Sequence, residues 1–179
     1  SENGSDNCIV NGTWGDVFKL KADGIRIEGF TITRGSNGIY IHSNNNSISN
    51  NNISNNDYCG ISLGQYSNEN SISNNNIPNN WRGIELWDSN NNSISSNNIS
   101  NNWDGIYLDD SINNTIYLNN FIDNAENAYS HNSINFWNST SQITYTYEDR
   151  TYTNYLGNYW SDYTGSDEDG DGIGDIPYS

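Results

Sequence analysis

The residues best suited to chemistry in this sequence are aspartates near its C-terminus. The motif Asp167-x-Asp169-x-Asp171-Gly-Ile173-Gly-Asp175 places carboxylates at loop positions 1, 3, 5 and 9, with glycine at position 6 and the backbone carbonyl of Ile173 at position 7. Loops with this spacing wrap oxygen ligands around calcium. We therefore expect Ca2+ as a cofactor, against the alternative of an acidic tail that holds no cation.

The loop departs from the full calcium pattern at position 12. Tyr178 stands where a bidentate glutamate normally completes the coordination shell. Water or another carboxylate would have to take that place, and Asp162 and Glu168 are the candidates. We expect an affinity in the weak range of extracellular calcium sites.

Aromatic residues form a second candidate site. They recur just before a repeated glycine and on the strand position that follows it: Tyr58, Trp81, Trp87, Trp103 and Tyr107. Exposed rings in a row could bind the apolar faces of sugars. The alternative is that they cover turns or pack against a neighbouring molecule, as aromatic residues do at interfaces.

Catalysis would need a pair of carboxylates about 5–10 Å apart. Asp109, Asp110 and Glu85 could supply such a pair, because successive turns of the expected fold lie about 4.8 Å apart. Arg82 is the one basic residue near them, and it stands alone. A polysaccharide lyase or hydrolase therefore remains an alternative to a non-catalytic protein.

Composition excludes several classes of function. The 179 residues carry a formal net charge of −16, with 6 Lys+Arg against 22 Asp+Glu, so binding to nucleic acid or to an anionic membrane surface is not expected. No apolar run approaches the length of a membrane span. The scarcity of aliphatic residues is typical of disordered chains, but aromatic residues make up 13 % and the apolar residues are periodic, which favours a folded repeat protein.

A repeat of about 22 residues decides the fold. Its register falls on Gly38, Gly60, Gly83 and Gly105, each followed by an apolar-x-apolar pair and later by isolated isoleucines. Short strands of this kind bury their inner faces only by stacking copy on copy. We predict an all-β, right-handed parallel β-helix over residues 1–136, in one continuous domain with an aromatic C-terminal cap at 137–179 that contains a β-hairpin and the calcium loop.

Asparagine occupies 37 positions, and the repeat aligns one group of them just before the third strand of each turn: Asn52, Asn76, Asn98 and Asn120. Amides stacked at strand spacing can hydrogen-bond to one another, so we expect an asparagine ladder there. Other asparagines lie in glycosylation sequons and are possible attachment sites: Asn11, Asn45, Asn91, Asn113 and Asn138.

The two cysteines, Cys8 and Cys59, could form a disulfide within the chain or between chains. Pairing within the chain would require an N-terminal arm that crosses turns, because two intervening turns exceed the roughly 7 Å limit between Cα atoms. The N-terminal end of the β-helix lacks a covering amphipathic segment. An uncovered strand edge invites another chain, so we expect self-association through this end.

The whole chain resembles the NosD-like parallel β-helix proteins, also called carbohydrate-binding and sugar-hydrolysis domains, which are abundant on the surfaces of methanogenic archaea. The resemblance rests on the G-I-x-L and N-N-x-I-S repeats and on the tail from Ile143 to Tyr178. It implies the fold and a cell-surface location. The family name implies copper delivery, but this chain has no Met and two isolated histidines, His42 and His131, so it lacks the soft ligands that copper prefers.

These observations favour a non-catalytic structural protein of the cell surface. We expect calcium to stabilise the β-helix, and copies to assemble head to tail into an envelope layer, sheath or filament. The alternatives are a carbohydrate-binding module that uses the aromatic residues, possible polysaccharide or envelope-glycan partners included, and a β-helix lyase or hydrolase.

Overall fold

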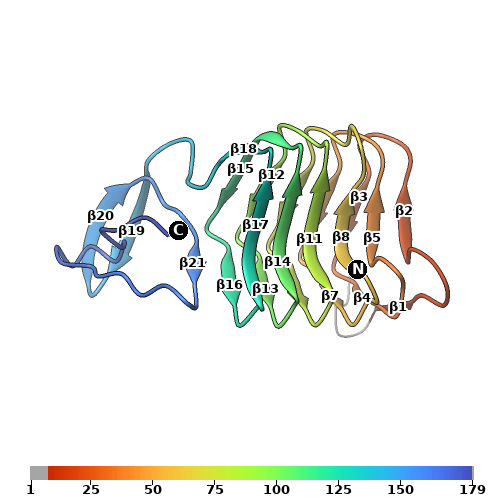
Figure 1. The fold of residues 1–179 in the computed structure, drawn as a ribbon, viewed down its shortest axis with the longest axis horizontal. Coiled ribbons are helices and arrows are strands. Elements are labelled where there is room, and N and C mark those ends of the chain that lie inside the picture. Colours follow the sequence, from red (N-terminus) through yellow and green to blue (C-terminus); the bar gives the residue numbers. More distant parts are fainter. Residues whose placement is uncertain (1–7, 179) are drawn as a thin grey trace.

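The computed structural model describes residues 8–178, which form a parallel β-solenoid of short strands (Figure 1). Within these residues no helix occurs, and thus none that could span a bilayer. Three parallel sheets run along the rod, and each takes one strand from every turn. The predicted all-β solenoid with about 22 residues per turn is confirmed.

Sheet A contains β1 (Ile9–Asn11), β4 (Thr31–Thr33), β7 (Asn52–Ser54), β10 (Asn76–Pro78), β13 (Asn98–Ser100), β16 (Asn120–Ile122) and β21 (Tyr159–Trp160). Sheet B contains β2 (Phe18–Leu20), β5 (Ile39–Ile41), β8 (Cys59–Leu63), β11 (Arg82–Trp87), β14 (Asp104–Asp109) and β17 (Glu126–His131). Sheet C contains β3 (Arg26–Glu28), β6 (Ser47–Ser49), β9 (Ser71–Ser73), β12 (Ser93–Ser95), β15 (Ile112–Tyr117) and β18 (Ile134–Phe136).

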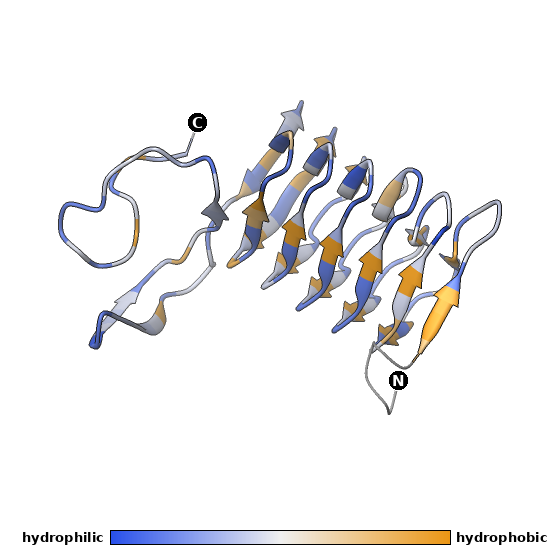
Figure 2. Ribbon diagram, turned by 90° about the horizontal axis from the view of Figure 1, so that it is seen from below, coloured by the Kyte–Doolittle hydropathy of each residue, from blue (hydrophilic) through white to orange (hydrophobic). Residues whose placement is uncertain are grey.

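The core is a set of aliphatic columns inside the three sheets. In sheet B, for example, Ile61 pairs with Ile84, and Ile84 with Ile106, and all three are fully buried. Alternation along each strand sends the neighbouring side chains outward, so hydrophobic segments recur at matching places on stacked strands (Figure 2). Each layer covers the next, which is how strands of three residues acquire a buried face.

The repeated glycines are required by close packing between turns. A Cβ atom on Gly60 would lie 2.5 Å from Cγ2 of Ile77 and 2.7 Å from the carbonyl oxygen of Gly83. Gly38, Gly83 and Gly105 meet equivalent obstacles from the turn that follows each of them. In the last sheet B strand the position belongs to Asn127, where no further sheet B strand follows within the described residues.

Most corners between sheets have a residue with positive φ before a buried asparagine, whereas several corners after sheet B have a buried serine there, as Ser89 follows Asp88. Asn74, with φ of 56°, precedes Asn75, and Asn79, with φ of 58°, precedes Asn80. Asparagine tolerates the left-handed conformation better than most residues, and its amide also satisfies backbone groups that a buried corner would leave unpaired. The Asn-Asn doublets of the sequence are these corners.

The chain leaves the solenoid after β18 and makes a two-stranded antiparallel hairpin, β19 (Ile143–Tyr147) and β20 (Arg150–Asn154). Glu148 and Asp149 both have positive φ, as a two-residue type I′ turn requires. The chain then returns to sheet A as β21. Figure 1 shows the hairpin and the C-terminal segment beyond the last full turn, at the end of the rod opposite β1 and β2.

Candidate functional site

The outer face of sheet B carries the densest group of polar side chains, and the solenoid register assembles it. Outward positions on successive strands align Ser62, Glu85, Tyr107 and Tyr129 in one column. A second column contains Cys59, Arg82, Asp104 and Glu126. Residues about 22 apart in sequence therefore become direct neighbours on this face.

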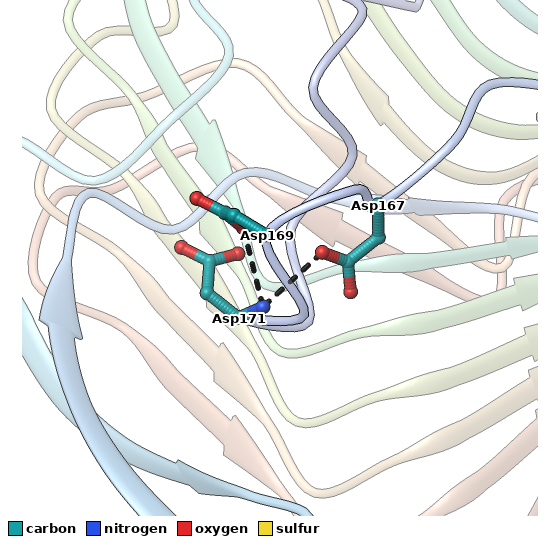
Figure 3. Close-up of side chains that lie close together, drawn as sticks. All are labelled: Asp167, Asp169 and Asp171. Carbon is teal, nitrogen blue, oxygen red and sulfur yellow. Dashed lines mark hydrogen bonds between the residues drawn. The ribbon is translucent and has the colours of Figure 1, made fainter.

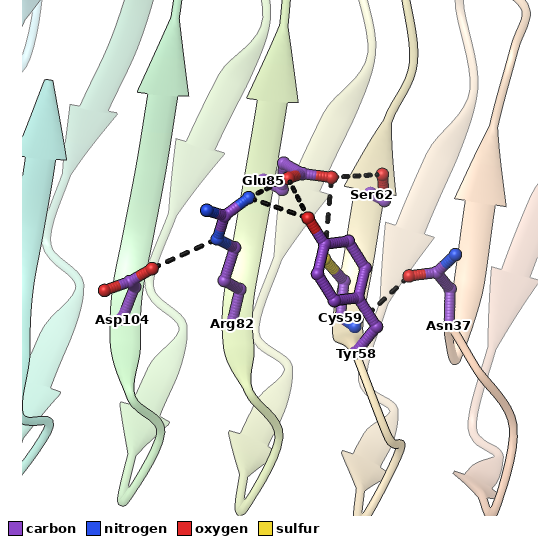
Figure 4. Close-up of polar contacts among 7 residues, drawn as sticks. All are labelled: Asn37, Tyr58, Cys59, Ser62, Arg82, Glu85 and Asp104. Carbon is purple, nitrogen blue, oxygen red and sulfur yellow. Dashed lines mark hydrogen bonds and ion pairs between the residues drawn. The ribbon is translucent and has the colours of Figure 1, made fainter. Parts of the chain in front are cut away.

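Arg82 is the centre of a hydrogen-bonded network (Figure 4). Its Nε donates to Oδ2 of Asp104 at 3.1 Å, and its Nη1 pairs with Oε1 of Glu85 and donates to the hydroxyl of Tyr58 at 2.9 Å. The guanidinium also lies 3.5 Å from the centroid of the Tyr107 ring, a cation–π arrangement. The next turn and the strand of Arg82 itself each supply a carboxylate to this guanidinium.

Both carboxylate oxygens of Glu85 accept hydrogen bonds. Its Oε2 accepts hydrogen bonds from Ser62 Oγ at 2.9 Å and from Cys59 Sγ at 3.6 Å, and its Oε1 accepts from Tyr58. Burial, reinforced by the Glu85 charge, raises the pKa of Tyr58 to about 12 and also raises the pKa of the Cys59 thiol. Both groups therefore stay protonated and act as donors to Glu85.

The three catalytic candidates have different surroundings. Both carboxylate oxygens of Glu85 are engaged in the Arg82 network. Asp109 Oδ1 lies 2.8 Å from Nδ1 of His131, and Asp110 occupies a corner with φ of 49°. Glu85 is thus committed to the Arg82 network, and Asp109 pairs with His131.

The aromatic residues of this face stack on one another along the rod. The Trp81 and Trp103 rings are 5.2 Å apart with an interplanar angle of 6°, and both are about half exposed. Tyr107 and Tyr129 stack in the same way at 4.7 Å and 9°. Ring faces thus meet ring faces, and the stacks turn their edges toward solvent.

Trp87 differs from the other aromatic residues of sheet B. It is 60 % exposed and, among the described residues, takes part in no ring stack. Its neighbour toward the C-terminus is Asp109, and Asp88 follows it in sequence. Of the five predicted aromatic candidates, Trp87 has the largest exposed fraction. Tyr58 is also outside the ring stacks, but it is less exposed and lies against the Arg82 guanidinium.

The C-terminal motif folds into a compact acidic loop (Figure 3). Carboxylate oxygens of Asp167, Asp169 and Asp171 lie within 4.8 Å of one another. The two oxygens of Asp167 accept backbone N–H groups of Gly170, Asp171 and Gly172 at 2.8–3.1 Å. Burial and the nearby Asp171 charge raise the pKa of Asp169, because the negative charges of the close carboxylates repel one another.

Tyrosines of the hairpin bind the backbone carbonyl groups of this loop. The Tyr145 hydroxyl donates to the carbonyl of Asp171 at 2.8 Å, and the Tyr152 hydroxyl donates to that of Gly170 at 2.9 Å. A Cβ atom on Gly172 would lie 2.8 Å from the Tyr147 ring, and Gly172 has φ of 86°. The hairpin and the loop therefore form one packed unit.

The other expected members of the metal shell have hydrogen-bond partners of their own. Asp175 Oδ2 accepts the backbone N–H of Glu168 at 2.5 Å. Asp162 accepts from Asn127 and from the Tyr178 hydroxyl, and the Tyr178 ring stacks on Trp160 at 4.2 Å. Asp162 and Tyr178 are thus committed to joining the cap to the last turn of the solenoid.

The predicted outer asparagines are hydrogen-bonded in part. Asn76 donates to Asn52 at 3.0 Å and Asn98 donates to Asn76 at 2.9 Å, whereas Asn120 continues the column in register. Sequence reasoning missed three longer, buried ladders: Asn46–Asn70–Asn92–Asn114–Asn135, Asn51–Asn75–Asn97–Asn119–Asn158 and Asn56–Asn80–Asn102–Asn124. Strand alternation could have revealed the first two, because these asparagines stand two residues before an inward residue.

The remaining predicted residues are placed as follows. Cys8 and Cys59 are free thiols: Cys8 precedes β1 of sheet A, and Cys59 is fully buried within the Arg82 network of sheet B. The structure therefore does not contain the disulfide within the chain. The five sequon asparagines are all exposed: Asn11, Asn45, Asn91, Asn113 and Asn138.

The geometry defines a parallel β-solenoid with internally paired polar groups. Among known families, the model described as "Periplasmic copper-binding protein (NosD)" matches residues 3–165. The chain therefore belongs to the NosD family. No curated protein matches it.

The residues present do not fit a copper site. Copper favours imidazole, thiolate and thioether ligands, and the sequence has no Met, two His and two Cys. His131 is bonded to Asp109. His42 stacks on Tyr40 and lies four turns away from His131. Cys59 is buried against Glu85. Within the described residues the one cluster of possible ligands is the all-oxygen group at Asp167, which suits a hard cation.

Proposed function

We propose that this chain is a non-catalytic structural β-helix located outside the cytoplasm, in line with the periplasmic description of its family. The observation that carries the proposal is that the polar groups of sheet B satisfy one another. Arg82, Glu85 and Asp104 are paired, and no buried side-chain nitrogen or oxygen of the described residues lacks a partner. Such groups contribute stability and leave little for chemistry on a substrate.

Self-association through the N-terminal end is part of this proposal. Within residues 8–178, β1 and β2 each have a neighbouring strand on one side only. Trp14 is 98 % exposed and Ile9 is 60 % exposed near the same end. Unpaired strand edges beside exposed apolar side chains are a template for association with another chain.

Analytical ultracentrifugation and electron microscopy test this association. Filaments would indicate head-to-tail contacts, and closed dimers would indicate contact between two N-terminal ends. Ile9→Asp should disperse either form, and Tyr66→Asp, on the side of the rod and similarly exposed at 62 %, is the matched control. Monomers at high concentration of the unsubstituted protein would refute the association.

We further propose that Ca2+ binds the Asp167–Asp171 loop and stabilises the C-terminal cap. The support is the spacing of the acids, the grouping of three carboxylates and the backbone anchors from Tyr145 and Tyr152. Three close carboxylates repel one another, and a bound cation would relieve that repulsion. The role of the ion is structural, because the loop contacts the hairpin and no reactive group.

Carbohydrate recognition is a second candidate, and Trp87 favours it. Its exposed ring lies next to Asp88, whose Oδ2 accepts a hydrogen bond from Gln65 at 2.9 Å. An aromatic face beside carboxylate and amide groups suits a neutral sugar. Retention on immobilised polysaccharide should be lost in Trp87→Ala. It should be kept in Trp14→Ala, the control, which removes another exposed tryptophan. Equal retention of both variants would refute the site.

A further inference from the structure

A large cleft separates the last turn of the solenoid from the C-terminal cap. Its volume is about 1060 Å³, and its walls include Ala128 and Ser130 of β17, Trp137, and Tyr145 and Tyr147 of the hairpin. Ligand sites in proteins are clefts of about 300–1,000 Å³, so this one is large enough for an organic ligand. The cleft exists because only sheet A gains a strand, β21, after the last full turn.

Asn127 distinguishes the last strand of sheet B from the four turns before it. Those four turns have glycine at this position, where a Cβ atom would lie 2.5–2.7 Å from the carbonyl oxygen of the next turn, whereas the first turn has Val17 there. The side chain of Asn127 is fixed by Asn124 and Asp162. These bonds tie the edge of sheet B that borders the cleft to the cap.

Aromatic rings and the absence of cations define the chemistry of the cleft. Seven lining residues are tyrosine or tryptophan, and no lining residue is charged. Trp137 and Trp160 make an angled pair, with centroids 5.8 Å apart and an interplanar angle of 53°. Trp160 also stacks on Phe121 and on Tyr178, so the exposed rings that line the cleft are those of Tyr147 and Tyr159.

The charges that surround the cleft are acidic. Asp162 bonds to the lining residue Tyr178, and the backbone of Asp171 bonds to the lining residue Tyr145. Burial and these carboxylates raise the pKa of both tyrosines. Arg150 is the only lysine or arginine that follows Arg82 in the sequence, and it does not line the cleft. A cation entering the cleft meets favourable charge without displacing a resident one.

We propose that the cleft between β17 and the hairpin binds an organic cation, an amine or quaternary ammonium group held against aromatic rings. Aromatic faces attract such cations through their quadrupoles, and the attraction grows when the cation leaves water. Surrounding carboxylates add long-range attraction that an uncharged ligand would not feel.

The test compares choline with 3,3-dimethylbutan-1-ol, a neutral molecule of the same shape in which carbon replaces the ammonium nitrogen. Tryptophan fluorescence and calorimetry should show saturable binding of choline and at least tenfold weaker binding of the alcohol. Equal binding of the two would overturn the proposal, since shape alone would then account for it. Binding of a neutral oligosaccharide in the cleft in preference to choline would overturn it as well.

Variants locate the site. Tyr159→Ala removes an exposed lining ring and should weaken choline binding at least threefold, with little change in melting temperature. Tyr147→Ala should weaken binding to a similar extent, and its melting temperature is measured in parallel because this ring also packs on Gly172. Tyr66→Ala removes a similarly exposed ring far along the rod and should have no effect. Trp87→Ala should also leave choline binding intact, which separates this cleft from the carbohydrate candidate on sheet B. Unchanged binding in both cleft variants would refute the assignment.

Discussion

The Cβ atom that Gly105 lacks would lie 2.5 Å from the carbonyl oxygen of Asn127, the residue that takes the place of glycine one turn later. The backbone therefore approaches the glycine column as closely as the absence of a side chain permits. The column ends at the turn where sheet B ends. Glycine in this fold is a requirement of stacking, which a substitution can measure.

Gly83→Ala should destabilise the protein strongly. The new Cβ would lie 2.5 Å from the carbonyl oxygen of Gly105 and 2.6 Å from Cγ2 of Ile99, and both belong to a close-packed interior. Overpacking of this kind costs about 1–3 kcal/mol. Gly15→Ala is the control, since nothing lies within 4 Å of its added Cβ. Urea unfolding should separate the two variants, and an equal midpoint would contradict the packing argument.

Loss of a buried ladder amide should cost more than loss of an outer one. Asn97 Oδ1 accepts both N–H groups of Asn75, and its Nδ2 donates to Ile72 and Asn119. Asn97→Ala leaves several buried groups unpaired, each worth about 1–3 kcal/mol. Asn76→Ala, on the exposed ladder, should cost about 1 kcal/mol or less, because water can replace its partners. Thermal unfolding of both variants checks the order, and the reverse order would refute it.

Stability should fall in alkaline solution because of Cys59 and Tyr58. Burial raises the pKa of the Cys59 thiol above its ordinary value of 9.0, and that of Tyr58 from 10.0 to about 12. Above pH 9 the unfolded chain loses protons that the folded chain keeps, so the free energy of unfolding decreases as pH rises. Cys59→Ala should flatten the decline between pH 9 and 10. An unchanged slope would mean that the thiol is not responsible.

Thiol reactivity gives an independent measure of the same environment. The thiolate is the reactive form, and Cys59 is fully buried and protonated beside Glu85. At pH 8 the native protein should be alkylated at Cys8 and spared at Cys59, with both labelled after denaturation. Peptide mass spectrometry distinguishes the two sites. Rapid labelling of Cys59 in the native state would contradict its placement.

Calcium should raise the melting temperature of the C-terminal cap. Binding to the folded loop stabilises it in proportion to the logarithm of ligand concentration. Asp167→Asn should abolish the calcium-dependent shift, because this carboxylate holds the loop and faces the other two. Asp149→Asn removes an acid of the same unit that lies in the hairpin turn, and it should retain the shift. An identical melting curve in chelator and in calcium would exclude the ion.

Much of the fold follows from the sequence because the repeat is regular. The glycine register predicts the turn length, and alternating Thr and Tyr predict the hairpin of β19 and β20. The Arg82 network was missed because Tyr58 and Asp104 stand 24 and 22 residues from Arg82, and the sequence must be aligned turn on turn to bring them together. Ring stacking was not foreseen in detail because the repeat fixes which rings are neighbours, whereas their tilt depends on packing.

The cleft could not be predicted from the repeat. The buried ladder advances by 22 residues from Asn97 to Asn119 and then by 39 to Asn158, so 39 − 22 = 17 extra residues enter the last turn. An insertion of that length has no register to follow. Its position depends on particular contacts, such as the stacking of Trp160 on Phe121 at 4.5 Å.

The uniform corners and glycine contacts also mean that the length of the rod can change by whole repeats. Each turn meets its neighbours through the same asparagine, glycine and isoleucine positions, so a whole copy can be duplicated or deleted without altering the surfaces that remain in contact. Every copy changes the length of the rod by about 4.8 Å. Asn127 and the cap mark the far end, so growth by gene duplication is confined to the interior, where length can be adjusted one unit at a time.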